Sequence, residues 1–386
     1  MNLVFFAHPS FLGQQSMPRF ARMLAEGMAN RGHTVEILSP RARFFNLHSH
    51  PTLSKWLGYI DQYIVFPSEV KAKLKKYPDD TLFVFTDQAL GPWVPIVADR
   101  PHIIHCHDFM ALRSALGEIP ENPTSWTGRQ YQNLIRKGFS KGRYFISVSQ
   151  KTREDLHRLV LSPPIASDVV YNGLHKPFHS IDPVKARAGF GEKTKLDLTD
   201  GYLLHVGANT WYKNRAGVLE IYDAWRTTYQ KYLPLLMIGE PTRELLSRQE
   251  QSPFKKDIHW LSGIEDETLR LAYAGASAFL FPSLGEGFGW PIAEAMASGC
   301  PVITTNEAPM TEVAGTAGFL IPKMPHDKSK IKEWAAQVAS VTQGLISLSP
   351  SERSAIVNAG IDNAKRFDTN RSLDRIEEIY KRILVK

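Results

Sequence analysis

The stretch PSLGEGFGWPIAEAMASG, residues 282–299, joins the end of an apolar strand to a helix. Its loop holds three glycines, and Pro291 suits the first turn of a helix that Gly299 ends. Glycines let backbone N–H groups approach a ligand closely, and a helix N-terminus favours anions and hydroxyl oxygens. Glu286 in the loop and Glu294 in the helix could therefore accept hydrogen bonds from two hydroxyl-rich groups. Alternatively, Glu294 only complements the helix dipole and Glu286 is a solvated loop residue.

A second strand–loop–helix stretch, LHVGANTWYKNR, occupies residues 204–215. Its strand ends at Gly207, and Asn214 can cap the helix that follows. Lys213 then lies where a phosphate would meet the positive end of the helix dipole. The GxxxxGK[ST] pattern of a phosphate-binding P-loop is absent. The alternative is that Lys213 is an ordinary surface lysine.

A third cluster, His105-Cys106-His107-Asp108, follows the apolar pair Ile103-Ile104. A His-x-His-Asp run can bind a metal, but a third ligand at a standard spacing is missing, so no metal site is predicted. His105 alternates with Ile103 and fits a histidine that packs in the core or in a loop. His107 is the better candidate for a side chain that faces a ligand.

Short apolar runs alternate with helical patterns along the whole chain. The predicted strands cover residues 3–7, 34–38, 81–86, 103–105, 144–148, 202–206, 235–238, 259–261, 278–281, 302–304 and 318–321. This alternation predicts an α/β protein with two Rossmann-like parallel-sheet domains. Polar residues 175–200, interrupted by Pro and Gly, mark the boundary, which gives domains 1–175 and 176–366. Ligands bind beyond the carboxyl ends of such strands, so we expect the chemistry in a central crevice.

The composition is that of an ordinary globular protein, with 386 residues of which 43% are hydrophobic and 22% charged. It excludes disordered, collagen-like and coiled-coil proteins. Two cysteines, Cys106 and Cys300, do not make a disulfide scaffold or a zinc ribbon. The sequence lacks a signal peptide and an apolar run of 18 residues, and this predicts a cytoplasmic protein.

The net charge of +7 is unevenly distributed. Residues 1–172 hold 20 Lys and Arg against 14 Asp and Glu, whereas the remaining residues hold 26 against 25. Aromatic-rich residues 56–66 precede a cluster of basic residues, Lys71, Lys73, Lys75 and Lys76. This pattern suits peripheral contact with an anionic membrane at its inner face, or a lipid-diphosphate acceptor. A core helix beside a solvated basic surface is the alternative. Nucleic-acid binding is not expected, because the basic residues match no such module.

Three sequence patterns that are typical of other enzyme classes are absent, and this narrows the range of reactions to consider. The chain has no Asp-x-Asp pair, and therefore lacks the metal–diphosphate clamp that is usual in one sugar-transferase fold. It has no GxGxxG, which argues against a dinucleotide oxidoreductase. It has no Gly-x-Ser-x-Gly nucleophile elbow either.

At the loop residues quoted above, the chain resembles the retaining GT-B glycosyltransferases of glycosyltransferase family 4, also called glycosyl transferases group 1. Residues 286–294 match the EGFG and E-x7-E signature of that family closely, and residues 299–303 continue it. The resemblance is nearly continuous over residues 201–322. Weaker pieces of it are Arg31–Val35, Tyr171–Gly173, Gly207 with Lys213-Asn214, Leu236–Gly239 and Glu312–Gly315.

The resemblance implies a role for each matching residue. Glu286 would hold hydroxyls of the donor sugar, Glu294 would bind the ribose, and Lys213 would neutralise the diphosphate. The backbone of the loop Gly287-Phe288-Gly289-Trp290 would face the sugar or its phosphate. Backbone near Gly207 and Gly263 would border the nucleotide, with the base at Gly263. In the first domain His107 would line the sugar site and Gly13 would approach the phosphate. A last helix, residues 367–386, would pack back on that acceptor-side domain.

The chain departs from the family in its diphosphate site. An Arg usually accompanies the Lys, but Ala208 and Tyr212 occupy the usual Arg positions. Arg215 or Asn209 would have to compensate, or activity would be low. The paired glycines of the first loop are reduced to Gly13 followed by Gln14, and Trp290 replaces a smaller apolar residue.

The resulting prediction is a metal-independent retaining hexosyltransferase. It would move a hexose from a UDP- or GDP-sugar to a glycan or lipid-linked acceptor in polysaccharide or glycolipid synthesis, without a cofactor. Preorganised charges would stabilise the leaving diphosphate, and a phosphate oxygen would take the acceptor's proton. Two alternatives remain: a nucleotide-sugar-binding regulatory protein without turnover, and a GT-B nucleotide-sugar epimerase.

Overall fold

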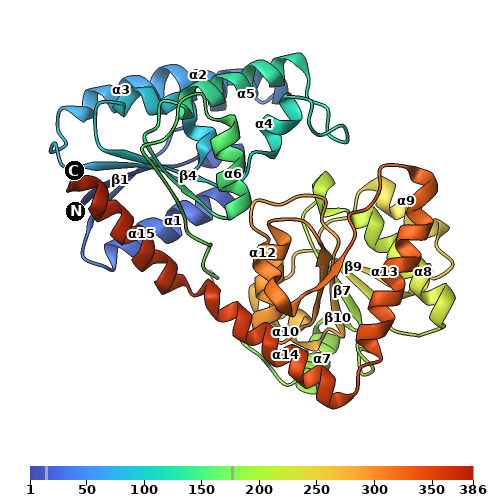
Figure 1. The fold of residues 1–386 in the computed structure, drawn as a ribbon. Coiled ribbons are helices and arrows are strands. Elements are labelled where there is room, and N and C mark those ends of the chain that lie inside the picture. The colour runs from blue at the N-terminus through green and yellow to red at the C-terminus, as the bar shows by residue number, and fades with distance from the viewer. Residues whose placement is uncertain (14–15, 175–177, 386) are drawn as a thin grey trace. The chain divides into compact units, whose positions relative to one another are not determined.

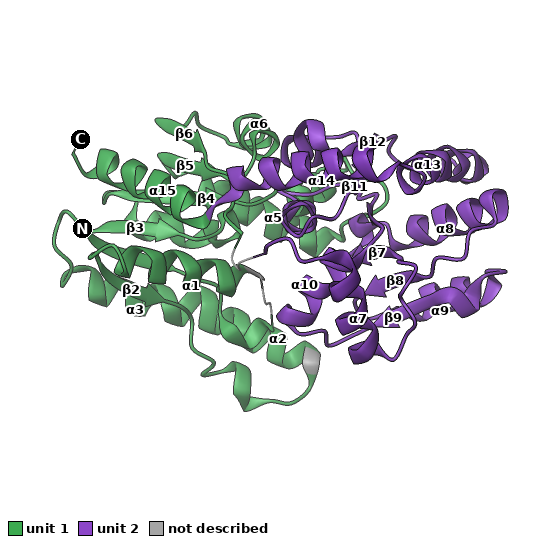
Figure 2. Ribbon diagram, turned by 90° about the horizontal axis from the view of Figure 1, so that it is seen from below, with its two compact units in different colours: residues 1–175, 369–386 green, residues 176–368 purple. Residues whose placement is uncertain are grey.

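The chain of the computed structural model divides into two units, and residues 1–13, 16–174 and 178–385 are described. Unit 1 consists of Met1–His175 with Thr369–Lys386, and unit 2 of Lys176–Asp368 (Figure 2). The predicted boundary after residue 175 falls on residues 175–177, which lie outside the described residues.

Unit 1 is built on a parallel sheet of six strands in the order β2-β1-β3-β4-β5-β6. The strands are β1 (Asn2–Phe6), β2 (Thr34–Leu38), β3 (Leu82–Phe85), β4 (His102–Cys106), β5 (Tyr144–Ser147) and β6 (Ala166–Val169). Phe5 of β1 pairs with Ile37 of β2 and with Val84 of β3. Because helices cover both faces of the sheet, its central strands are buried along their whole length.

Helices pack on each face of this sheet through apolar side chains. They are α1 (Ser16–Ala29), α2 (Pro51–Ile60), α3 (Phe66–Leu74), α4 (Met110–Ala115), α5 (Trp126–Phe139), α6 (Gln150–Leu159) and α15 (Thr369–Leu384). On one face α1 and α15 lie side by side (Figure 1). Ile376, Ile379 and Ile383 of α15 join Phe5 and Leu24 in one buried cluster. The spacing of these isoleucines places them on a single face of the helix.

Unit 2 repeats the architecture with the strand order β12-β11-β10-β7-β8-β9. Its strands are β7 (Leu203–Val206), β8 (Leu235–Ile238), β9 (Ile258–Leu261), β10 (Ala278–Phe281), β11 (Val302–Thr305) and β12 (Phe319–Ile321). Its helices are α7 (Pro183–Thr194), α8 (Arg215–Tyr229), α9 (Arg243–Gln251), α10 (Asp266–Gly275), α11 (Trp290–Ala297), α12 (Met310–Ala314), α13 (Ile331–Ile346) and α14 (Pro350–Ala364). Trp225 of α8 and Trp334 of α13 lie in the buried cluster that covers one sheet face.

The predicted strands agree with the observed ones to within one residue at each end, and β6 is the strand that the sequence analysis missed. Across the described residues, no helix has the length and apolar character needed to cross a membrane.

Candidate active site

The loops after two neighbouring strands of unit 2 bring a lysine and a glutamate together. Lys213 follows β7, and Glu286 follows β10, which is hydrogen-bonded to β7. Nζ of Lys213 lies 2.7 Å from Oε1 of Glu286. The two side chains are only 12% and 8% exposed. The sequence predicted both residues as site residues, and the structure joins them in one partly buried ion pair.

Local contacts hold this pair in place. The hydroxyl of Ser283 lies 2.7 Å from Oε1 of Glu286 and 2.8 Å from the carbonyl oxygen of Tyr212. The N–H of Leu284 donates to the same carbonyl over 2.7 Å. Nζ of Lys213 lies 4.7 Å from the centroid of the Phe281 ring, within the range of a cation–π interaction. The ammonium and the carboxylate are therefore positioned by both loops.

Asn214 links the same loops and begins α8. Its side-chain oxygen accepts a hydrogen bond from the N–H of Gly217 over 3.2 Å, so the predicted cap is confirmed. Its side-chain amide donates to the carbonyl of Pro282 over 2.9 Å. The N-terminus of α8 thus begins next to Lys213.

The glycine-rich loop leads into α11 through Gly289, whose φ of 106° is a conformation that glycine adopts readily. Phe288 is buried and its ring packs 5.4 Å from that of Phe367. Glu294, half-buried within α11, accepts a hydrogen bond from the Tyr273 hydroxyl over 3.0 Å. Burial and the Glu294 carboxylate raise the pKa of Tyr273, so this hydroxyl stays a donor.

Arg215 does not present its guanidinium to solvent. It is almost fully buried, and it donates to the carbonyls of Gly239 over 2.8 Å and Glu240 over 2.6 Å. Its guanidinium also lies 4.8 Å from the ring of Trp260. These donors are already used inside unit 2, which weakens the prediction that Arg215 compensates for the missing diphosphate arginine. Asn209, by contrast, is exposed.

Three predicted glycines lie in loops that follow strands. The N–H of Gly207 donates to the carbonyl of Ile238 over 3.1 Å. Gly13 in unit 1 and Gly263 in unit 2 have φ values of 69° and 67°. Apart from the glycine itself and its two chain neighbours, no described residue has an atom within 4 Å of a Cβ built at either of these two positions, so both leave open space beside the backbone.

In unit 1 the two predicted histidines have different surroundings. Burial lowers the pKa of His105 to about 3, and its ring shares a 2.7 Å hydrogen bond with the Tyr380 hydroxyl of α15. Nε2 of His107 donates to the carbonyl of Thr86 over 2.9 Å. Burial also lowers the pKa of His107. His105 therefore packs in the core, as the sequence indicated. Among the described residues, no three His, Cys, Asp or Glu side chains are grouped to hold a metal.

The structure adds a pair that the sequence analysis did not single out. His8 follows β1 and Asp87 follows β3, and Nε2 of His8 lies 2.9 Å from Oδ2 of Asp87. Both residues, with His107 after β4, stand at the carboxyl edge of the unit 1 sheet. Their positions in the sequence could have indicated these two residues, because both are polar and directly follow predicted strands.

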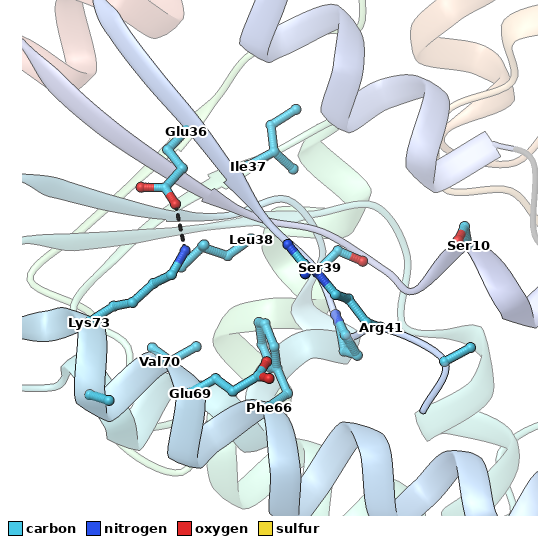
Figure 3. Close-up of a pocket in the computed structure, with 13 residues that line it drawn as sticks. Ser10, Glu36, Ile37, Leu38, Ser39, Arg41, Phe66, Glu69, Val70 and Lys73 are labelled. Carbon is cyan, nitrogen blue, oxygen red and sulfur yellow. Dashed lines mark hydrogen bonds and ion pairs between the residues drawn. The ribbon is translucent and has the colours of Figure 1, made fainter. Parts of the chain in front are cut away.

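A hollow of about 810 Å³ also lies on unit 1, beside β2 and α3 (Figure 3). Its wall combines apolar side chains with charged ones, among them Glu36, Arg41, Glu69 and Lys73. Lys73 donates to Glu36 over 2.9 Å, as Figure 3 shows. None of the predicted site residues lines this hollow.

Known families match both units. The family described as Glycosyl transferases group 1 matches residues 200–343, and the family described as Glycosyltransferase Family 4 matches residues 17–176. The chain belongs to glycosyltransferase family 4. HepE of Anabaena, crystallised with UDP and glucose, is similar over 99% of both chains, with a TM-score of 0.71 and 16% identity. This family 4 chain therefore has the GT-B fold.

Curated relatives of this family 4 chain include mannosyltransferases. O-antigen chain mannosyltransferase B of Escherichia coli is 32% identical over 184 residues, which are 47% of this chain and 46% of the relative. The phosphatidyl-myo-inositol mannosyltransferase of Mycobacterium leprae is 24% identical over 381 residues, 93% of this chain and 91% of the relative. The chain spans only about half the length of O-antigen chain mannosyltransferase B, and 57% of the length of the O-antigen chain mannosyltransferase RfbU of Salmonella typhimurium.

Proposed function

We propose that this chain is a metal-independent, retaining glycosyltransferase that moves a hexose from a nucleoside diphosphate sugar to a glycan or lipid-linked acceptor. The observation that carries the proposal is the Lys213–Glu286 pair, at 2.7 Å, beside the start of α8. A lysine at such a position can stabilise the negative charge that develops on a departing diphosphate. The carboxylate beside it can accept hydrogen bonds from sugar hydroxyls.

The two groups then exchange partners when the donor binds. Lys213 leaves Glu286 for the diphosphate, and the freed Glu286 oxygens accept hydroxyl groups of the hexose. Glu294 accepts the ribose hydroxyls, and the loop backbone at Gly287–Gly289 faces the sugar and phosphate. Because charge stabilisation comes from Lys213 and the N-termini of α8 and α11, no metal is required. A phosphate oxygen takes the proton of the attacking hydroxyl.

Mannose is the hexose that the relatives favour. The two relatives described above are both named as mannosyltransferases, one for an O-antigen chain and one for phosphatidyl-myo-inositol. The HepE structure contains UDP and glucose, so UDP-glucose is the second donor to examine. We therefore propose polysaccharide or glycolipid synthesis as the process.

The test is turnover of GDP-mannose and UDP-glucose with glycan and lipid-linked acceptors, with and without EDTA. We expect product whose anomeric configuration, read by NMR, equals that of the donor, and a rate that EDTA leaves unchanged. Isomerised donor without an acceptor would identify an epimerase. Donor binding without any turnover would identify a regulatory protein. An inverted anomer, or a loss of activity with EDTA, would contradict the retaining or the metal-independent part.

Peripheral contact with an anionic membrane extends this proposal to the acceptor. Trp56 of α2 is 59% exposed and Ile64 is 63% exposed, while Lys71 and Lys75 lie exposed further along. Asp61 and other residues of the same segment are buried, so only part of it is free to meet lipid. We expect more protein to float with anionic than with neutral liposomes, and less at high salt. Equal recovery with both lipids would contradict the electrostatic part.

A further inference from the structure

The backbone at the end of β10 is held by side chains from neighbouring elements. The carbonyl of Phe281 accepts from the Thr304 hydroxyl over 2.9 Å. The carbonyl of Ser283 accepts from the Thr305 hydroxyl over 2.7 Å, and the carbonyl between these two accepts from the side chain of Asn214. Three consecutive carbonyls are therefore fixed in place, and the position of Ser283 is fixed with them.

The Ser283 hydroxyl lies among three acceptors but carries one proton. Its Oγ is 2.7 Å from Oε1 of Glu286, 2.8 Å from the carbonyl oxygen of Tyr212 and 3.1 Å from that of Gly285. A hydroxyl donates one hydrogen bond at a time. The Tyr212 carbonyl also accepts the N–H of Leu284 over 2.7 Å. It therefore keeps a donor when the serine proton turns to the carboxylate.

The two oxygens of the Glu286 carboxylate are used unequally. Nζ of Lys213 and the hydroxyl of Ser283 both lie 2.7 Å from Oε1. Within residues 1–13, 16–174 and 178–385, Oε2 makes no hydrogen bond or ion pair, and it is not fully enclosed. Oε2 is therefore the oxygen that a ligand can reach without displacing the lysine or the serine.

The proposed function changes the surroundings of Oε1. When Lys213 moves to the diphosphate, Oε1 loses the positive charge that faces it. Ser283 is the donor that stays, because its backbone is fixed from β11 and its hydroxyl only needs to rotate. A hydrogen bond to a charged acceptor is stronger than one to a neutral carbonyl, so the serine proton then favours the carboxylate.

We propose that Ser283 is a positioning residue, whose hydroxyl holds Oε1 of Glu286 once Lys213 has turned to the diphosphate and so presents Oε2 to a hydroxyl of the hexose. This inference rests on the proposed function and deepens it. The sugar hydroxyl donates to Oε2, whereas Ser283 does not touch the sugar. All three side chains belong to unit 2. Because Lys213 also holds Glu286 in the free protein, Ser283 matters most in the donor complex.

Ser283→Ala removes this hydroxyl and leaves the Tyr212 carbonyl with its donor from Leu284. We expect the Kd of the sugar donor, GDP-mannose or UDP-glucose, to rise about tenfold, since a hydrogen bond to a charged group is worth at least this factor. Transfer should slow as well. The Kd of free GDP or UDP should stay within about twofold, because the nucleotide does not contact Glu286. Calorimetric titration without an acceptor measures both constants.

A double-mutant cycle tests whether Ser283 acts through Glu286. Glu286→Ala removes the carboxylate to which the serine hydroxyl donates. Adding Ser283→Ala to it should therefore change the Kd of the sugar donor by less than about twofold. A general loosening of the loop would instead produce the same loss in both backgrounds, so the cycle separates positioning from a merely structural role.

Thr304→Val is the matched control. Thr304 and Ser283 are both fully buried, and each carries one hydroxyl at the end of the same strand pair. The Thr304 hydroxyl donates to the carbonyl of Phe281 and not to Glu286. Any loss of sugar-donor affinity in Thr304→Val should therefore add in full to the loss in Glu286→Ala.

Three outcomes would overturn the inference. One is an unchanged Kd of the sugar donor in Ser283→Ala. Another is an equal rise in the Kd of the free nucleotide. The third is an undiminished effect of Ser283→Ala in the Glu286→Ala background. If the unsubstituted protein transfers no hexose, the proposed function fails and this inference fails with it, whereas an active protein with an unaffected Ser283→Ala variant refutes the inference alone.

Discussion

At the carboxyl edge of the unit 2 sheet, an ammonium and a carboxylate form one ion pair, Lys213–Glu286. At the corresponding edge of unit 1 stand two imidazoles, His8 and His107, and one buried carboxylate, Asp87. In unit 2, Nζ of Lys213 and the hydroxyl of Ser283 both lie 2.7 Å from the same oxygen, Oε1 of Glu286. The unit 1 carboxylate has both oxygens occupied from within.

This difference suggests a division of chemistry between the units. A lysine that can leave its carboxylate suits a ligand that brings negative charge and hydroxyls together, as a nucleoside diphosphate sugar does. In unit 1 burial lowers the pKa of His107, and a neutral imidazole suits an uncharged hydroxyl.

The largest effect should come from Lys213→Ala. The lysine matters most as the diphosphate leaves, so kcat should fall by roughly 10²–10³, the scale for one preorganised charge-stabilising group. Steady-state kinetics with saturating donor and acceptor measure this. A kcat within twofold of the original value would contradict the assignment of the diphosphate to this edge.

Glu294→Gln should mainly weaken nucleotide binding. A hydrogen bond to a charged acceptor is worth about 1.5–3 kcal/mol, so the Kd of the free nucleotide should rise roughly 10–100-fold. Tyr273 still has an oxygen to donate to in the amide, which keeps the helix intact. Calorimetric titration with GDP and UDP measures the change. Unaltered affinity together with impaired transfer would move Glu294 away from the ribose.

Acid should destabilise both units by the same mechanism. Burial lowers the pKa of His105 in unit 1 and of His205 in unit 2 to about 3. In the unfolded chain a histidine binds its proton near pH 6.5. Below that pH, protonation stabilises the unfolded state relative to the folded state, so the free energy of unfolding falls. Each ring should cost about 2 kcal/mol of unfolding free energy between pH 6.5 and pH 5.

Denaturant unfolding at these two pH values measures that loss. His105→Gln and His205→Gln should each reduce the pH-dependent loss by about 2 kcal/mol, whatever they cost at pH 7. If neither variant changes the difference between pH 6.5 and pH 5, the two rings are not buried as neutral groups.

The smallest effect on nucleotide affinity should come from Glu286→Gln. The amide cannot pair with Lys213 as an ion, yet it can still accept a hydrogen bond from the Ser283 hydroxyl. The Kd of the free nucleotide should change by less than about threefold, while the Kd of the sugar donor rises and transfer slows. If Glu286→Gln loses free nucleotide and Glu294→Gln keeps it, the two glutamates have exchanged roles.

Much of the fold was predictable because its strands are short apolar runs that end in loops. All four residues of β3, Leu-Phe-Val-Phe, are apolar and buried, as expected of a strand between two helical layers. Strand β6 was missed since Ala-Ser-Asp-Val lacks such a run and lies half-buried at the edge of its sheet. An edge strand is fixed by pairing with its neighbour, and this long-range contact leaves no local pattern.

For the site, too, the local sequence indicated some residues but not the contacts between them. Glu286, Glu294 and Lys213 could be singled out because glycines, a proline and a cap surround them. Their pairing could not, since Lys213 and Glu286 are 73 positions apart. The His8–Asp87 pair joins residues 79 positions apart with no motif at either one. Only the parallel order β1–β3, which places both strand ends at one edge, brings them together.

The return of α15 to unit 1 has a consequence for biosynthesis. This helix follows unit 2 in the chain, so the ribosome makes it only after all of unit 2 has been translated. Until then Phe5, Leu24 and Val84 lack the isoleucines of α15 that cover them. The nascent protein therefore carries an open apolar face through the synthesis of some 190 residues, Lys176–Asp368. Domains usually fold in the order in which they leave the ribosome. Here unit 1 leaves the ribosome first, but it can complete its apolar core only after unit 2 and α15 have been made.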